Sequence, residues 1–401
     1  MKPKPDARHE VTRTAQDEQT NLGADDLLGQ ALARQNMARA WQRVKANKGS
    51  AGVDGRTVQA TGEYLKTAWA DIRAALLAGR YRPEPVRPVG IPKPGGGTRE
   101  LGIPTVVDRL IQQALLQVLQ PLIDPSFSAH SHGFRPGRSA HGAVLQAQQY
   151  VAAGCTTVVD VDLEKFFDRV NHDILMDRLA KRIQDKQVLR LIRRYLQAGV
   201  MAHGVCSQRD EGTPQGGPLS PLLANVLLDE VDRELERRGH KFVRYADDCN
   251  VYVKSRRAGE RVLKALRDCY AKLALKVNEA KTAVAPVWGR KFLGYCMRPA
   301  KAGPKLAVAP QALDKLRERV RQLTRRSRGR SLEQVAADLR VYVPGWKAYF
   351  QLAQTPTVMQ ALDRWLRHRL RAVQLAQWKR GPTAYRALRR LGAGRDQALC
   401  I

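Results

Sequence analysis

A tetrapeptide, Tyr245-Ala246-Asp247-Asp248, limits the possible folds of this chain more than any other part of its sequence. It lies inside Lys241–Tyr252, whose apolar stretches on both sides predict a β-hairpin with the acids at its tip. Two adjacent carboxylates repel each other at short range, and a cation between them relieves that repulsion. An exposed acidic turn without a function is the alternative interpretation of the tetrapeptide alone.

A second acidic stretch favours the functional interpretation. Thr156–Leu163 is rich in β-branched residues and predicts a strand, along which Asp160 and Asp162 alternate and point to one face. If this strand lies beside the hairpin, Asp162 and Asp247 can bind two hard cations through oxygen, with Asp248 nearby. Two such cations suit phosphoryl transfer, because one activates a 3′-hydroxyl and the other stabilises the leaving pyrophosphate.

The chain as a whole carries the opposite charge. Of its 401 residues, 69 are Lys or Arg and 38 are Asp or Glu, which gives a formal net charge of +31 and indicates nucleic acid as a partner. In so basic a chain, a cluster of acids stands out as a candidate functional site. Because 43% of the residues are hydrophobic, the chain can bury large cores, and general disorder is excluded.

Several other classes of protein are excluded. Met1–Thr20 is polar and charged, which argues against a secretory signal, and the longest charge-free runs are broken by Gln, His or Pro, which argues against a membrane span. Six cysteines without a CxxC pair favour neither a disulfide framework nor a zinc site. We therefore expect no membrane partner and a reducing cytoplasmic location, in a bacterial-type cytosol or nucleoid.

Three regions follow one another along the chain. Residues 1–24 are polar without an apolar period and are predicted to be a disordered tail. Residues 25–303 combine helices and short strands, whereas residues 304–401 are basic and predicted to be helical from Lys305 onward, which indicates a separate domain. Helices are expected over Asp25–Val44, Gly62–Leu77, Thr105–Ile123, His172–Ile183, Lys186–Ala198, Pro221–Arg237 and Glu260–Leu273, and strands over Ala283–Val287 and Lys291–Met297.

Two aromatic residues follow the first acidic stretch. Phe167 lies five residues after Asp162, and a ring at that offset can lie under the sugar of an incoming nucleotide. There it would clash with a 2′-hydroxyl, the group that separates ribonucleotides from deoxyribonucleotides. The alternative is that Phe166 and Phe167 belong to the core, and we expect this of one of the two.

Further blocks lie around the two acidic stretches. They are Lys48–Gly55, Tyr81–Pro94, Leu101–Pro104, His132–Ser139, Val159–Asp168, Gly212–Pro221, Tyr245–Asp248, Leu275–Thr282, Phe292–Tyr295, Gly345–Phe350 and Gln377–Arg380. In this order, from about Asn36 to about Leu391, they resemble the group II intron-encoded reverse transcriptase/maturase family. The resemblance implies an α+β, right-hand polymerase, with fingers and palm over residues 25–303 and an α-helical thumb/maturase domain over 304–401.

The resemblance also implies roles for single residues. Asp162, Asp247 and Asp248 would form the catalytic triad, and Asp162, Asp247 and the main-chain oxygen of Leu163 would bind two Mg²⁺ ions. The implied nucleotide-binding residues are Lys93 and Arg99 at the triphosphate, Phe167 at the sugar, and Gln215 and Gly216 at the nucleotide and template. The implied nucleic-acid-binding residues are Lys48, Arg135 and Lys281.

We therefore expect an RNA-directed DNA polymerase that adds dNTPs to a DNA or RNA primer on an RNA template, and that binds intron RNA and assists its splicing. One alternative is a splicing-only maturase with a decayed site, against which the retained triad argues. Another is a domesticated reverse transcriptase in DNA repair or phage defence, which the sequence leaves open, as it does a homodimer. An RNA polymerase is a distant further alternative, because Phe167 should disfavour ribonucleotides.

The C-terminal part departs from the family pattern. There is no His/Cys-rich endonuclease after the maturase-like blocks, so nicking of target DNA is not expected. The chain ends soon after Gln377–Leu388, which leaves open a truncation at the C-terminus. Such a truncation would put intron mobility in doubt more than polymerisation.

Overall fold

The computed structural model describes residues 26–92, 97–202, 205–207, 211–213, 216–326 and 329–399, with backbone only at 99, 202 and 205–207. The predicted tail of residues 1–24 lies outside this part. The described residues form two compact units, one within Met1–Ser139 and Val159–Val284 and the other within Ala140–Val158 and Ala285–Ile401. Both contain helices and antiparallel strands, so the predicted α+β class is confirmed. The domain boundary that we predicted at residue 304 stays a prediction.

The first half of the first unit is mainly helical. Its elements are α2 (Leu27–Ala31), α3 (Arg34–Ala46), α4 (Val58–Leu77), β1 (Arg87–Pro92), β2 (Thr98–Ile103) and α5 (Val106–Ile123). The N-cap side chains of Thr57 and Thr105 accept hydrogen bonds from the first turns of α4 and α5, which fixes where both helices begin. Strands β1 and β2 pair antiparallel.

The single helix predicted over Asp25–Val44 is wrong, because the chain breaks it into α2 and α3. Ala33 is extended, with φ −62° and ψ 140°. The amide of Asn36 donates to the carbonyl oxygen of Ala31 at 2.8 Å and to that of Ala114 in α5 at 3.0 Å. A side chain thus fills an acceptor that a continuous helix would bond internally, and the bend lets both short helices bury their apolar faces.

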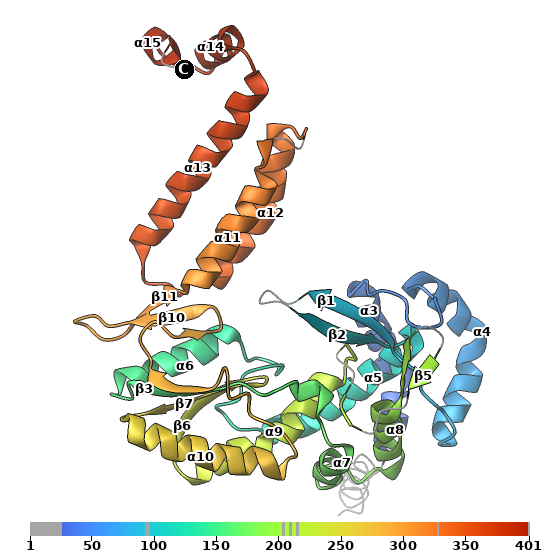
Figure 1. The fold of residues 1–401 in the computed structure, drawn as a ribbon. Helices are drawn as coiled ribbons and strands as arrows, with labels where there is room; N and C mark the ends of the chain where they lie inside the picture. Colours follow the sequence, from blue (N-terminus) through green and yellow to red (C-terminus); the bar gives the residue numbers. More distant parts are fainter. Residues whose placement is uncertain are drawn as a thin grey trace, which may run out of the picture. The chain divides into compact units, whose positions relative to one another are not determined.

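A four-stranded sheet dominates the second half of this unit. The elements are β3 (Thr157–Val161), α7 (His172–Ala180), α8 (Lys186–Gln197), β4 (Val200–Ala202), β5 (Val205–Ser207), α9 (Ser220–Arg237), β6 (Lys241–Tyr245), β7 (Asp248–Val253), α10 (Arg256–Lys272) and β8 (Ala283–Pro286). The strand order is β6-β7-β3-β8. Helices α9 and α10 lie along the sheet and contact β6 and β7 (Figure 1).

One large apolar cluster forms the core of the first unit. It joins side chains of α5, α7, α9 and the sheet, among them Ile111, Leu175, Leu227, Phe242 and Val251, each at most 1% exposed. Every residue of β7 after Asp248 is buried, so this strand is covered on both faces. The hairpin that carries the acids is therefore fixed to the interior of the unit.

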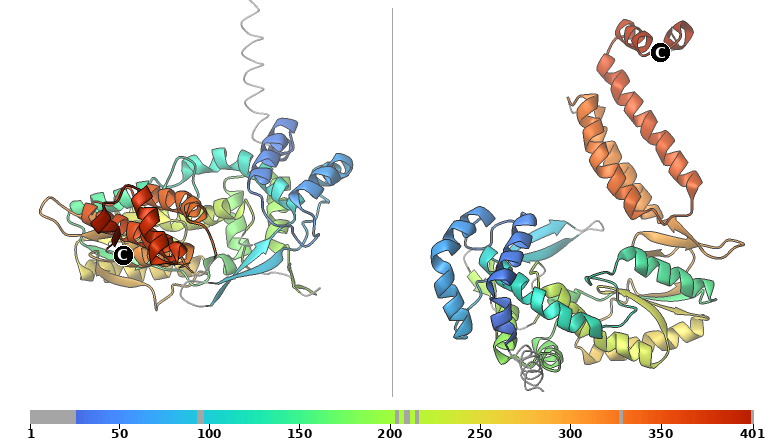
Figure 2. Two further views of the ribbon diagram at one scale, coloured as in Figure 1. Left: turned by 90° about the horizontal axis from the view of Figure 1, so that it is seen from above. Right: turned by 180° about the vertical axis from the view of Figure 1, so that it is seen from behind.

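The second unit combines a small sheet with long helices. Its elements are α6 (Ala140–Ala152), β9 (Lys291–Phe292), β10 (Tyr295–Arg298), β11 (Lys305–Val308), α11 (Pro310–Leu323), α12 (Leu332–Tyr349), α13 (Pro356–Trp378), α14 (Gly381–Arg390) and α15 (Arg395–Leu399). Helix α12 contacts both α11 and α13, and the three helices share a core that includes Val320, Leu339 and Val373 (Figures 1 and 2). None of the helices in the described ranges is long and apolar enough to cross a membrane.

Two predictions for this unit are wrong. The single strand expected over Lys291–Met297 is the hairpin of β9 and β10, because Leu293 and Gly294 have φ values of 50° and 81° and turn the chain. Lys305–Val308, expected to begin a helix, is β11 and pairs antiparallel with β10. Its last three residues are buried in the sheet, and this tertiary packing outweighs helix propensity.

Candidate active site

The two acidic stretches lie on neighbouring strands. Strand β3, which leads to Asp162, pairs with β7, which begins at Asp248. The predicted hairpin is confirmed: Tyr245 pairs with Asp248, so Ala246 and Asp247 form its two-residue turn. Asp162 and Asp247 are half-buried and Asp248 is exposed. The condition on which the sequence argument depended, that the strand lies beside the hairpin, is therefore met.

Hydrogen bonds fix the backbone around Asp162. Its N–H donates to Oγ1 of Thr282 at 3.2 Å, and its carbonyl oxygen accepts from the N–H of Asn278 at 2.8 Å. Leu163 forms an antiparallel bridge with Val277, in which Asp162 and the residue after Leu163 make the hydrogen bonds. Since main-chain groups alternate in direction along a strand, the carbonyl of Leu163 points away from Val277, toward the side of β3 where β7 lies.

A lysine lies next to the first carboxylate. The ammonium nitrogen of Lys281 is 3.5 Å from Oδ2 of Asp162, and the two side chains are 68% and 33% exposed. Lys281 is one of the residues for which we predicted a contact to nucleic acid. Its position brings a solvent-exposed cation to the edge of the acidic site.

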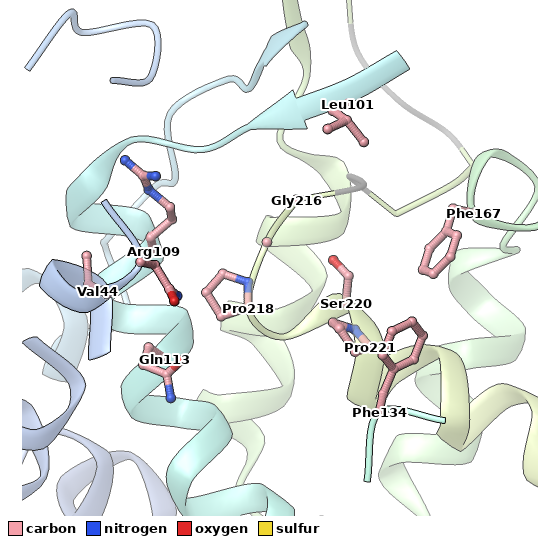
Figure 3. A pocket seen from close by; sticks show the side chains of 12 residues that line it. Val44, Leu101, Arg109, Gln113, Phe134, Phe167, Gly216, Pro218, Ser220 and Pro221 are labelled. Atoms are coloured by element: carbon pink, nitrogen blue, oxygen red, sulfur yellow. The ribbon is translucent and has the colours of Figure 1, made fainter. Parts of the chain in front are cut away.

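A cavity of about 430 Å³ lies in the same unit (Figure 3). Its lining includes Phe167 and Gly216, which the sequence analysis had singled out, and Arg109, Gln113 and Phe134, which it had not. Phe166 is 3% exposed and belongs to the core, whereas Phe167 is half-buried at the cavity wall. The expectation that one of the two rings is a core residue is confirmed.

Close backbone packing explains the glycine at the cavity. Gly216 has φ 139°, and a Cβ there would lie 2.7 Å from the carbonyl oxygen of Gly102 in β2, so a side chain would clash with the strand. The preceding loop is fastened to the turn that carries Phe167. The N–H of Thr213 donates to the carbonyl oxygen of Phe167 at 2.7 Å, and a ring nitrogen of His172 lies 2.7 Å from the carbonyl oxygen of Gly212.

The basic loop after α3 packs against the start of α5. Arg109 donates from Nη2 to the carbonyl oxygen of Ser50 at 2.6 Å, and burial lowers the pKa of its guanidinium. A Cβ at Gly52 would lie 2.6 Å from Cα of Thr105, so only glycine permits this approach. Lys48 has an exposed side chain in this loop, which keeps it available for the predicted contact to nucleic acid.

Arg135 has internal partners in the structure. Its side chain is only 5% exposed and forms an ion pair with Asp124, with Nε 2.9 Å from Oδ1. The guanidinium also donates to the carbonyl oxygens of Asp124, Ser128 and Ser131. These internal bonds occupy its donors, so Arg135 supports the loop around it, and its contact to nucleic acid stays a prediction.

Three residues predicted to bind the nucleotide have no described side chain. Lys93 and Gln215 lie outside the described residues. Arg99 is described by its backbone alone, in β2, where it pairs with Ile91. Arg109 and Phe134 were missed; only Phe134 lay in a block that the sequence analysis had singled out, next to Arg135.

The donor atoms of the acidic site fit Mg²⁺. Within the described part of the chain, no three His, Cys, Asp or Glu side chains are gathered to hold a metal ion. Mg²⁺ does not require this, because it keeps several waters and binds through one or two carboxylates together with substrate phosphates. Cys249 follows Asp248, but burial raises the pKa of its thiol to about 12, which keeps this soft donor neutral.

Comparisons with known proteins identify the family of the chain. The model of the family "Reverse transcriptase (RNA-dependent DNA polymerase)" matches residues 91–297, and that of "Group II intron, maturase-specific domain" matches residues 313–392. Protein YkfC of Escherichia coli (strain K12) is 38% identical over 208 residues, which cover 50% of this chain and 55% of YkfC. The group II intron-encoded protein LtrA of Lactococcus lactis subsp. cremoris is 36% identical over 206 residues, which cover 51% of this chain and 34% of LtrA.

Solved structures give weaker similarities. A telomerase from Candida albicans, in complex with a fragment of telomeric RNA, has a TM-score of 0.45 at 13% identity over 72% of this chain and 60% of that one. A partial Cas6-RT-Cas1–Cas2 complex has a TM-score of 0.39 at 25% identity over 60% of this chain and 42% of that one. The reverse transcriptase match alone covers more than half of the 401 residues, and the chain therefore belongs to the reverse transcriptase (RNA-dependent DNA polymerase) family, with a group II intron maturase-specific domain after it.

Proposed function

We propose that this protein is an RNA-directed DNA polymerase, which adds dNTPs to a primer 3′-hydroxyl on an RNA template. The observation that carries this proposal is the pairing of β3 with β7, which brings Asp162 to the hairpin of Asp247 and Asp248. The acids and the cavity belong to one site. A Cβ on Gly133 would lie 2.1 Å from the amide nitrogen of Ala246 in the hairpin turn, and the next residue, Phe134, lines the cavity.

Two Mg²⁺ ions are the cofactors of the proposed reaction, as the family implies a metal-dependent polymerase. Asp162 and Asp247 would hold them, the carbonyl oxygen of Leu163 would complete the second, and Asp248 would add negative charge beside them. When bound, the two ions activate the primer 3′-hydroxyl and stabilise the charge of the leaving pyrophosphate. The open side of Asp162, which is 33% exposed, supports access for such ions and for the substrate phosphates.

The incoming dNTP is proposed to occupy the cavity. Lys93 and Arg99 would bind the triphosphate, because a fixed ammonium and a bidentate guanidinium suit phosphate oxygens. Gln215 and Gly216 would lie against the nucleotide and template, and Phe167 would exclude a 2′-hydroxyl. The half-buried ring of Phe167 at the cavity wall supports this last role.

We also propose that the protein binds intron RNA and assists its splicing in the cytosol. The maturase-specific match covers helices that carry many exposed basic residues, among them Arg319, Arg340, Lys347, Arg364 and Arg371. Contacts from such side chains to phosphates supply affinity without base specificity. Lys48 and Lys281 would add contacts to template and primer. The chain spans about half the length of YkfC and a third of LtrA, so neither protein's further activities are carried over.

Primer extension tests the proposed polymerase activity. Purified protein should extend a DNA primer on an RNA template only with Mg²⁺, and Asp247→Ala should abolish extension while RNA binding stays nearly intact. Asp173→Ala is the matched control, because it removes an acid that is 80% exposed on α7 and should leave extension unchanged. Full activity in Asp247→Ala would contradict the site. If neither the wild type nor the two variants extend the primer, but all three still bind RNA, a splicing-only maturase is favoured.

The choice of sugar tests the role of Phe167. Phe167→Ala should increase the use of rNTPs relative to dNTPs, because the ring no longer occupies the space beneath the sugar. Phe134→Ala removes another ring of the same cavity, one that is 46% exposed, and should weaken nucleotide binding without changing the choice of sugar. An unchanged dNTP/rNTP ratio in Phe167→Ala would return this residue to a packing role.

A further inference from the structure

The residue before the YADD tetrapeptide is a fully buried arginine. Arg244 in β6 is 0% exposed and forms an ion pair with Asp232 of α9, also 0% exposed, with Nη2 2.6 Å from Oδ2. Burial alone would lower the pKa of Arg244, but the carboxylate of Asp232 outweighs burial and raises it. The arginine is therefore a charged group in the interior, directly behind the proposed catalytic hairpin.

All five N–H groups of this arginine have partners. Nε donates to Asp232 at 2.8 Å, and Nη2 donates to Asp232 at 2.6 Å and to Oγ of Ser131 at 2.8 Å. Nη1 donates to Oδ1 of Asn225 and to the carbonyl oxygen of Ala246, each at 2.9 Å. A guanidinium has five donors in one plane, so this set of acceptors fixes its position in every direction.

These partners come from three segments that build the site. Asn225 of α9 also donates to the carbonyl oxygen of Gly133 at 2.9 Å, and Gly133 packs on the amide of Ala246. Phe134, the residue after Gly133, lies at the cavity wall, and Ala246 precedes Asp247 in the hairpin turn. Arg244 thus joins the hairpin, α9 and one wall of the cavity at a single point.

The turn that Arg244 holds has an unfavourable backbone conformation. Ala246 has φ 58°, in the left-handed region that is unfavourable for a non-glycine residue and persists only where the surroundings fix it. Stability alone does not explain a buried ion pair here, because apolar residues of similar volume are often as stabilising or more so. What an apolar group cannot supply is a directed bond to the carbonyl of Ala246.

We propose that Arg244, held by Asp232, is a positioning residue for the reaction: it sets the turn of Asp247 and Asp248 against the nucleotide cavity. This inference rests on the proposed polymerase function. It differs from a purely structural role in that loosening the fork should change the geometry of the carboxylates more than the stability of the fold.

A pair of conservative variants separates the two roles. Arg244→Lys keeps the charge but replaces the five-donor fork by one ammonium, which cannot reach all four partners. Arg182→Lys is the matched control, because Arg182 pairs at 2.5 Å with Asp229, a buried acid one turn before Asp232 on α9, and its other described contact is the ring of Phe127, outside the hairpin. Both variants should lower the melting temperature by a few degrees, which takes stability out of the comparison.

Kinetics and hydrogen exchange supply the readouts. Arg244→Lys should lower kcat about 10- to 100-fold, as expected for a small misplacement of catalytic groups, and raise the Mg²⁺ concentration at half-maximal rate. The KM for dNTP should change much less. Amide hydrogen exchange in the apoprotein should become faster at Tyr245–Cys249 in this variant. Arg182→Lys should leave kcat, the Mg²⁺ dependence and exchange in the hairpin as in the wild type.

A milder variant guards against a failure of Arg244→Lys to fold. Ser131→Ala removes one acceptor of the fork and should lower kcat a few-fold, with the same direction of change in Mg²⁺ dependence. Wild-type kcat and exchange in both Arg244→Lys and Ser131→Ala would overturn the proposal, as would equal losses in Arg182→Lys. If the wild type extends no primer, the proposed function fails, and hydrogen exchange still decides whether Arg244 positions the hairpin.

Discussion

The aspartates of the first unit fall into two groups with opposite surroundings. Asp108, Asp229 and Asp232 are at most 1% exposed, and each accepts hydrogen bonds from neighbouring side chains. Asp162 keeps 33% of its side chain exposed and meets Lys281 at 3.5 Å. A buried carboxylate that neighbouring protein donors hold fixes structure, whereas one with solvent access can accept a cation. The environment, and not the residue type, separates the two uses.

The largest expected effect is on activity at Asp162, the half-buried acid with solvent access. Asp162→Asn should lower the single-turnover rate of primer extension about 10³- to 10⁴-fold, because metal ions supply several kcal/mol of transition-state stabilisation and an amide binds them poorly. The free energy of unfolding should change by less than about 1 kcal/mol, since exposed ion pairs contribute little. If Asp162→Asn lost much of its stability but kept its activity, Asp162 would have to be counted among the structural aspartates.

The buried aspartates should affect mainly the stability of the fold. Asp232→Asn should lower the free energy of unfolding by about 3–5 kcal/mol, because it leaves the charge of Arg244 buried without its counter-ion. Urea unfolding followed by circular dichroism measures this, with Asp162→Asn as the control that keeps its stability. A loss below about 1 kcal/mol would show that the remaining partners of Arg244 suffice without the carboxylate.

Asp108 predicts a pH dependence of stability. Burial raises its pKa from 3.8 to about 6, although Thr105, Tyr81 and the N–H of Glu84 donate to it and oppose this shift. A raised pKa means that the folded state favours the protonated acid. The stability from its protonation is present below about pH 4 and is lost as the pH rises through 6, a change of about 3 kcal/mol.

Asp108→Asn isolates this contribution. An amide does not titrate, so the unfolding free energy of the wild type minus that of the variant should fall by about 2 kcal/mol between pH 4 and pH 7. Other titrating groups cancel in the difference. Urea unfolding at several pH values measures it, and a difference that is independent of pH would mean that the hydrogen bonds offset burial.

The elements near the acids were predictable because their signals are local. The alternation around Tyr245–Asp248 and the β-branched run before Asp162 each fit within one strand or hairpin, and both elements formed where expected. A short turn, Phe166–Asp168, follows Asp162 and places Phe167 at the cavity wall, while its role at the sugar stays a prediction. Function near a strand end can be inferred when the residues that carry it are neighbours in sequence.

The features that the sequence did not predict depend on contacts between residues that are far apart in the chain. Nothing near Arg135 in the sequence indicates that Asp124 and three carbonyl groups fill its donors, and its predicted role came from the family resemblance alone. Asn36 breaks a predicted helix through a bond to Ala114, 78 residues away. Arg244 was passed over for the same reason, because its partners lie on three separate segments. Whether a charge is internal or functional is decided by tertiary structure.

The smallest expected effect concerns Lys281, the cation at the edge of the site. Lys281→Gln should change the free energy of unfolding by less than about 1 kcal/mol, because its pair with Asp162 is exposed. If Lys281 contacts a primer phosphate, as proposed, the variant should bind template–primer more weakly at low salt. The slope of log affinity against log salt should then become shallower by about one.

Lys264→Gln gives the matched comparison. Lys264 is exposed on α10, away from the acids in sequence and in the fold, and its removal lowers the net charge of the protein by the same amount. A general electrostatic effect would shift both variants equally, whereas a phosphate contact at the site would shift only Lys281→Gln. Equal salt slopes in the wild type and Lys281→Gln would leave Lys281 as a partner of Asp162 alone. In that case the ion pair of Lys281 with Asp162 would be structural, although both side chains reach solvent. Exposure alone would then not separate functional from structural aspartates, and the partner of each acid would have to be considered as well.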